Sequence, residues 1–88
     1  MIYAVGGIKN YMKKVQIFST PSCVYCVAAK NFFKENHIEY EEFNVAEDME
    51  KRTEMIKRSG QMGVPVIIIE NDIVVGFNKD KVANLLGL

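Results

Sequence analysis

Two cysteines, Cys23 and Cys26, are separated by Val24 and Tyr25 and follow a short run typical of a strand. The residues from Val24 to Glu35 have the composition of a helix, which places both thiols at its first turn. A helix N-terminus carries free amide N–H groups and a partial positive charge, and both favour a thiolate over a thiol. We therefore expect Cys23, nearer the solvent, to be the nucleophile. Cys26, one turn later, would attack the resulting mixed disulfide, so the pattern predicts thiol–disulfide exchange.

Two other uses of a cysteine pair are weaker here. A structural zinc site usually takes four ligands, whereas this chain has two cysteines and one histidine, His37, far along the chain. One chain cannot complete such a site, although a dimer could. A purely structural disulfide between Cys23 and Cys26 would close a very small loop and remove little chain entropy. The redox interpretation is therefore favoured.

A second motif, Val64-Pro65, opens an apolar strand. Proline can occupy the first position of a strand because no ladder hydrogen bond is needed from it there. A cis Val64-Pro65 bond beside the cysteines would leave the backbone of Val64 free to pair with an extended substrate, as in strand addition. Only ~5–6% of X-Pro bonds are cis, so the residues by themselves favour trans.

Length and composition restrict the function classes. The chain has 88 residues, enough for one domain, and its 11 basic and 11 acidic side chains cancel. No basic stripe indicates nucleic-acid binding. The longest apolar run, 64–69, is far shorter than the ~20 residues of a membrane span. No secretory signal is apparent, so a cytoplasmic protein without a membrane or nucleic-acid partner is expected.

The domain is expected to begin at Met12, which reads as a second start. Residues 1–11 have no pattern that pairs with the rest and are predicted to be a flexible extension, leaving 12–88 as the folded domain. The predicted elements alternate strand and helix and then close with a hairpin: strand 14–19, helix 24–35, strand 38–45, a helix ending at Gly60, strands 65–69 and 73–75, and helix 79–86. This β-α-β-α-β-β-α order predicts an α/β fold with a four-stranded mixed sheet between helices.

Local signals also suggest how the helices begin and pack. Ser22 is a plausible N-cap for the first helix, and Asn44 or a neighbour for the second. In the second helix, Met49, Thr53 and Ile56 share one face and are expected to lie in the core.

From residue 13 to residue 88 the chain resembles the glutaredoxins and glutaredoxin-like redoxins. The resemblance is carried by the segment ending in Cys23-Val24-Tyr25-Cys26, by Val64-Pro65 about forty residues later, and by a glycine, Gly76, after the hairpin. It implies a thioredoxin fold with sheet order 2-1-3-4, a cis proline, and reversible dithiol–disulfide exchange.

The resemblance also implies a substrate-binding set, with departures from the usual pattern. Typical glutaredoxins have Lys or Arg where this chain has Thr20, Thr where it has Gly63, and Gly-Gly where it has Val75-Gly76. The sequence Gly76-Phe77 is similar to that of the NrdH-redoxin type. Phe77 could equally be a plain hydrophobic contact that closes the last helix. The residues expected to contact substrate are Thr20, Tyr25, Gln61, Val64, Pro65, Gly76, Phe77 and Asn78.

The same resemblance implies the partners. No bound cofactor or metal is expected, and electrons would come from glutathione or from NADPH through thioredoxin reductase. The substrate would be a disulfide-containing protein, ribonucleotide reductase being one implied by the NrdH type, or a glutathione conjugate, and the protein would be a monomer. An alternative is a dimer that holds a metal or iron–sulfur cluster between two Cys23 thiolates, with glutathione completing the ligands. Proline is absent between the cysteines, which leaves this alternative open.

Overall fold

The computed structural model describes residues 13–88, so the extension predicted for residues 1–11 lies outside the described residues. Its seven elements follow the predicted order. They are β1 (Val15–Ser19), α2 (Val24–Glu35), β2 (Glu41–Asn44), α3 (Met49–Ser59), β3 (Val66–Ile69), β4 (Asp72–Val75) and α4 (Lys79–Leu86). No helix among these residues is both long and apolar enough to cross a membrane.

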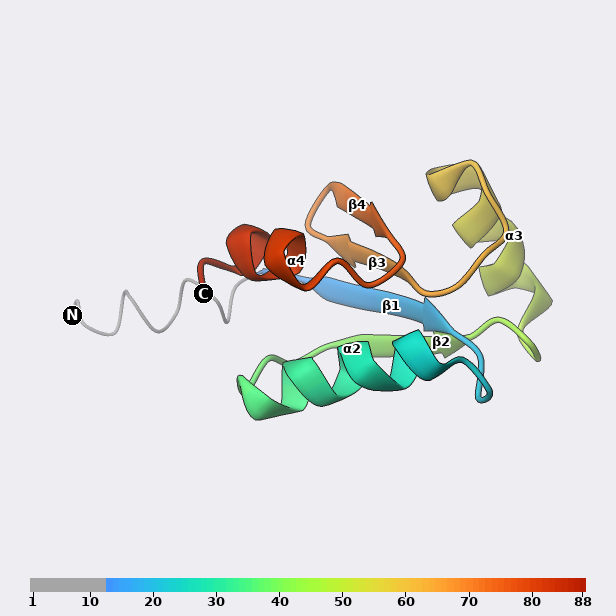
Figure 1. Ribbon diagram of the computed structural model, residues 1–88. Coiled ribbons are helices and arrows are strands. Elements are labelled where there is room, and N and C mark those ends of the chain that lie inside the picture. The colour runs from blue at the N-terminus through green and yellow to red at the C-terminus, as the bar shows by residue number, and fades with distance from the viewer. Residues whose placement is uncertain (1–12) are drawn as a thin grey trace.

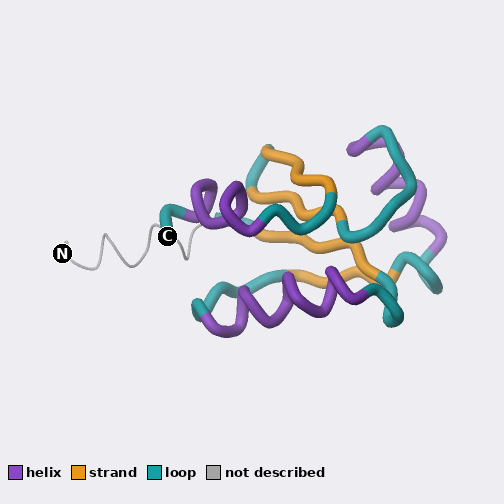
Figure 2. The backbone as a smooth tube through the Cα atoms, viewed as in Figure 1, coloured by secondary structure: helices purple, strands orange, loops and turns teal. Residues whose placement is uncertain are grey.

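The four strands form one sheet in the order β2-β1-β3-β4 (Figure 1). β1 pairs in parallel with β2, whereas β3 is antiparallel to both β1 and β4. This is the predicted thioredoxin fold. The strand β1, one of the two central strands, ends at Ser19, directly before the loop that leads to the cysteines, so a largely buried strand precedes the start of α2 (Figure 2).

The helices cover both faces of the sheet because successive strand residues point to opposite sides. On one face, α2 and α4 pack over β1, β3 and β4 through a cluster that includes Ile17, Phe33 and Val82. On the other face, α3 packs through a smaller cluster that includes Phe18 and Met55. The strand β3 is buried along its whole length, because both of its faces are covered.

Two predicted N-caps need correction. The N-cap of α2 is Cys23 instead of Ser22, and the N-cap of α3 is Asp48, whose side chain accepts the N–H of Lys51. Asn44 instead closes a short turn by accepting the N–H of Ala46. Several polar side chains near a helix start can accept a free backbone N–H of the first turn. The backbone conformation decides which of them becomes the N-cap.

The second strand is shorter than predicted and begins at Glu41. His37 has a positive φ of 57°, and the N–H of Ile38 returns to the carbonyl of Phe33 at 2.8 Å. Ile38 is therefore used to end α2 and to fill the core, and it cannot pair with β1 at the same time.

The predicted inner face of α3 was also wrong. Met55 is fully buried, whereas Met49 is 64% exposed and Thr53 is exposed. Met49 is the first residue of the helix and lies where the chain leaves the sheet edge, beyond the reach of the core. Ile56 is half-buried against the same cluster as Met55, so only part of the predicted face packs inward.

Candidate active site

Cys23 stands at the junction between the loop after β1 and the first turn of α2. Its backbone is extended (φ −85°, ψ 115°), and its N–H donates to the carbonyl of Thr20 at 3.3 Å. Its Sγ accepts the backbone N–H of Cys26 at 3.2 Å, as a capping side chain does. Such a bond is stronger to a thiolate nucleophile than to a thiol.

The two thiols differ in access to solvent. Both are free, which corresponds to the reduced form. Cys23 is half-buried, whereas Cys26 has no exposed surface. Burial, followed by a hydrogen bond with Cys23, raises the pKa of the Cys26 thiol to about 12, against weaker lowering effects from the backbone of Thr20 and from Lys30. The geometry therefore gives one accessible thiol and one protected thiol behind it.

The Val64-Pro65 segment meets Cys23 across the molecule. The Sγ of Cys23 lies 3.8 Å from the carbonyl oxygen of Val64, within hydrogen-bond range for sulfur. The peptide bond between Val64 and Pro65 is cis, as the family resemblance implied. The carbonyl of Pro65 in turn accepts the N–H of Gly76 at 2.8 Å, and Gly76 has a φ of 81°. The Cys23–Val64 contact, in which a thiol S–H would donate, the peptide bond and the Gly76–Pro65 hydrogen bond thus bring together four of the predicted site residues, Cys23, Val64, Pro65 and Gly76.

A groove of about 390 Å³ runs beside this junction on the side of α3. Its lining includes two residues predicted from the sequence, Thr20 and Val64, together with Gly63. It also includes Arg52 from α3 and the exposed Met62, neither of which the sequence had indicated. Arg52 is the one cationic side chain in the lining. It precedes Val64 by twelve residues, so no local motif links the two.

The remaining predicted residues are placed less directly. Tyr25 is 67% exposed at the outer surface of the first turn of α2. The side-chain amide of Gln61 is engaged with Gly63, donating to its carbonyl at 3.0 Å and accepting its N–H at 2.7 Å. Gln61 therefore holds the loop before Pro65, and its amide is already occupied.

Phe77 and Asn78 follow Gly76 and have local structural partners. Phe77 packs against the main core, with its ring 5.8 Å from that of Phe32. Asn78 is the N-cap of α4 and accepts the N–H of Lys81 at 3.1 Å. The hydrophobic-contact interpretation of Phe77 thus has a physical basis in this packing.

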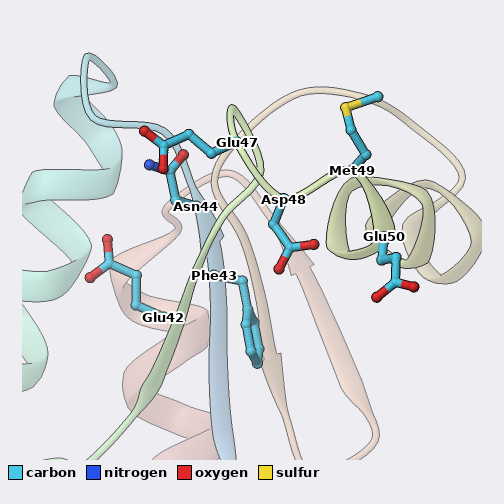
Figure 3. Close-up of a pocket in the computed structure, with 7 residues that line it drawn as sticks. All are labelled: Glu42, Phe43, Asn44, Glu47, Asp48, Met49 and Glu50. Carbon is cyan, nitrogen blue, oxygen red and sulfur yellow. The ribbon is translucent and has the colours of Figure 1, made fainter.

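A second hollow, of about 590 Å³, lies at the connection between β2 and α3 (Figure 3). Four carboxylates are among its lining residues, Glu42, Glu47, Asp48 and Glu50. None of the residues predicted for the active site lines it. It is therefore a separate feature of the surface.

The comparisons with known proteins agree with this geometry. The glutaredoxin family model matches residues 15–74. The chain belongs to the glutaredoxin family. It is 44% identical over 72 residues, covering 82% of this chain and 96% of the other, to an uncharacterized glutaredoxin-like 8.6 kDa protein in the rubredoxin operon of Clostridium pasteurianum.

Solved structures confirm the thioredoxin-like fold. A mutant of a thioredoxin-like protein superimposes with a TM-score of 0.81 at 34% identity, covering 86% of this chain and 97% of that one. The glutaredoxin-like protein NrdH-redoxin of Escherichia coli, described as having a thioredoxin-like activity profile, gives a TM-score of 0.72 at 26% identity, with coverage of 82% and 93%. Glutaredoxins are thiol–disulfide redox proteins, and the pair Cys23 and Cys26 is the redox motif of this one.

Proposed function

We propose that this glutaredoxin is a dithiol–disulfide oxidoreductase that reduces protein disulfides or glutathione mixed disulfides. The observation that carries the proposal is the position of Cys23. It caps α2, accepts an amide N–H through Sγ, and is reachable from solvent beside Val64, while Cys26 is buried one turn behind it. Cys23 attacks the substrate disulfide, and Cys26 then displaces the reduced substrate.

The substrate is proposed to dock along the groove beside Val64. The half-buried Val64 offers its backbone to an extended peptide, as in strand addition, and the exposed Met62 and Tyr25 offer apolar surface. This arrangement suits a peptide that carries its disulfide in an extended segment. Either a protein or a glutathione conjugate meets this description.

The electron donor depends on how well the groove holds glutathione. The absence of a basic residue at Thr20 and the Gly76-Phe77 sequence support a donor of the thioredoxin reductase type. Arg52 supports glutathione, because its guanidinium lines the groove and could bind a carboxylate. We propose glutathione as a usable donor and thioredoxin reductase as the faster one.

The proposal is tested by two coupled assays. The oxidised protein is offered glutathione with glutathione reductase and, separately, NADPH with thioredoxin reductase, and NADPH consumption is recorded. Cys23→Ser should abolish turnover in both assays, whereas Cys26→Ser should retain reduction of glutathione mixed disulfides only. Substantial turnover by Cys23→Ser would contradict the function, and faster reduction by glutathione would overturn the order of donors.

The cluster-binding alternative would need two copies of the chain. Among the described residues, no group of three or more His, Cys, Asp or Glu side chains lies together as a possible metal site. Any cluster would therefore have to bridge Cys23 of two molecules with external thiols. Anaerobic purification followed by an absorption spectrum and a mass measurement in solution decides it, since a coloured dimer would support this alternative.

A further inference from the structure

The resolving step requires Cys26 to lose its proton, and the surroundings of Cys26 partly oppose that loss. Cys26 must lose its proton to attack, yet it is fully buried, and burial together with the neighbouring Cys23 holds its pKa far above the ordinary value. Once Cys23 is bound to a substrate sulfur, Cys23 no longer carries a charge. Burial then remains as the opposing effect, and the backbone of Thr20 and the ammonium group of Lys30 remain as the favourable ones.

Lys30 is placed one helical turn after Cys26 on α2. Residues four apart in a helix lie on the same face, so Lys30 follows Cys26 on the same side of α2. Lys30 is held on this side by an ion pair, because its Nζ lies 2.8 Å from the Oε2 of Glu42. The side chain of Lys30 is 22% exposed, so solvent screens its field only in part.

The carboxylate of Glu42, which pairs with Lys30, is also held by a hydrogen bond from the sheet. Glu42 lies on β2 and turns toward α2, whereas the adjacent Phe43 points to the other side of the sheet (Figure 3). The hydroxyl of Ser19, a side chain 1% exposed at the end of β1, donates to the same Oε2 at 2.9 Å. Ser19 of β1, Glu42 of β2 and Lys30 of α2 are therefore linked by consecutive hydrogen bonds.

Two further titratable side chains act on the linked residues Glu42 and Lys30. Tyr40 on the chain before β2 faces Lys30, and Lys34 of α2 faces Glu42. The hydrogen bond with Glu42 raises the pKa of Lys30, so Lys30 remains a cation at neutral pH. Lys34 lies one turn further from the cysteines along α2 than Lys30 does.

We propose that Lys30, oriented by Glu42 and Ser19, is a positioning residue that favours the thiolate of Cys26 in the resolving step. This inference rests on the proposed dithiol function. Cys26 gives up its proton to water, and its sulfur electron pair forms the Cys23–Cys26 bond. The bond between Cys23 and the substrate sulfur breaks, and the substrate leaves as a thiolate that takes up a proton from water. Lys30 keeps its charge throughout and exchanges no electrons.

The experiment separates the two steps by stopped flow. The reduced protein is mixed with excess dithiobis-nitrobenzoate, a disulfide that releases a coloured thiolate at each step. The first phase reports attack by Cys23 and depends on reagent concentration. The second phase reports attack by Cys26, does not depend on it, and should disappear in Cys26→Ser. If the unchanged protein shows no second phase, the proposed dithiol function itself is contradicted.

Lys30→Met should slow the second phase by about threefold or more at neutral pH, because the thiolate fraction falls faster than nucleophilicity rises. The first phase should not change. The deficit should shrink as the pH is raised, which a merely structural defect would not produce. Lys30→Arg should restore the rate.

Lys34→Met is the matched control, since it removes the same charge from the same helix. Its second phase should equal that of the unchanged protein, and thermal unfolding should confirm that each variant is folded. The inference is overturned if Lys30→Met leaves the second phase unchanged, if its deficit does not depend on pH, or if Lys34→Met slows the second phase equally.

Discussion

The Sγ of Cys23 lies 3.8 Å from the carbonyl oxygen of Val64, although 41 residues separate them in the chain. This contact joins the thiol at the start of α2 to the loop that is proposed to bind the substrate. A sulfur atom attacking a disulfide docked along Val64 would need little movement. The same contact explains why changes in either segment should affect one shared activity.

Arg52 should contribute to the binding of glutathione conjugates and not to the rate of the chemical step. Arg52→Gln removes the one cation from the groove lining, so KM for a glutathione mixed disulfide should rise by about tenfold, the size expected for a lost charge-assisted hydrogen bond of about 1.5 kcal/mol. The value of kcat and the rate with dithiobis-nitrobenzoate should stay unchanged.

Arg58→Gln is the control for this change, because Arg58 lies on the same helix but pairs with Glu54 away from the groove. Steady-state kinetics with both variants provides the check. An equal rise in KM for the two variants would mean that net charge, not the groove, sets the affinity.

Replacement of Gly76 should destabilise the fold without any steric clash. Its φ of 81° is strained for a residue with a side chain, although a Cβ there would meet no atom within 4 Å. Gly76→Ala should therefore lower the free energy of unfolding by about 1–2 kcal/mol. The N–H at position 76 donates to the carbonyl of Pro65, and a shift of the strained backbone would disturb this hydrogen bond. Turnover should therefore fall as well.

Urea denaturation measures this change, with Gly63→Ala for comparison. At Gly63 the added Cβ would meet the side-chain oxygen of Gln61 at 2.9 Å, and that flexible side chain can move. Gly63→Ala should therefore cost less than Gly76→Ala. The reverse order would contradict the backbone argument.

The burial of Cys26 predicts a loss of stability at alkaline pH. Its folded pKa of about 12 exceeds the ordinary value of 9.0, so the folded state keeps the proton that the unfolded state loses. The contribution to stability is full below pH 9.0 and is lost as the pH rises toward 12. In that window the slope should approach ~1.4 kcal/mol per pH unit.

Other groups also titrate at alkaline pH, so the reduced protein is compared with Cys26→Ala. The difference in free energy of unfolding between the two is measured by urea denaturation at a series of pH values. That difference should be constant below pH 9.0 and should shrink above it. A constant difference across the whole range would mean that the folded thiol ionises normally.

The inner face of α3 is tested by two methionines of the same helix. Met55 is fully buried, so Met55→Ala should cost about 2–5 kcal/mol of stability through lost contacts and the cavity left behind. Met49 is 64% exposed, so Met49→Ala should change stability by less than about 0.5 kcal/mol. Thermal or urea unfolding of both variants measures the difference, and similar losses would contradict the packing of α3.

The sequence by itself determined the features that depend on near neighbours along the chain. The spacing of Cys23 and Cys26 at a strand–helix junction identified the redox pair. The glycine at position 60 correctly marked the end of α3, where the C-cap has a φ of 77°. Strand and helix patterns predicted the element order, because hydrophobic periodicity is a local property.

Tertiary structure decided which of these groups are buried and which distant groups meet. Arg52 joins Thr20 and Val64 in one groove, and Glu42 reaches Lys30 from another element, although no spacing in the chain relates these residues. Met55 is buried in place of Met49 because the position of α3 against the sheet, not its own periodicity, sets the covered face. The cysteine pair was recognisable from its spacing, whereas the burial of Cys26 follows from packing α2 onto the sheet.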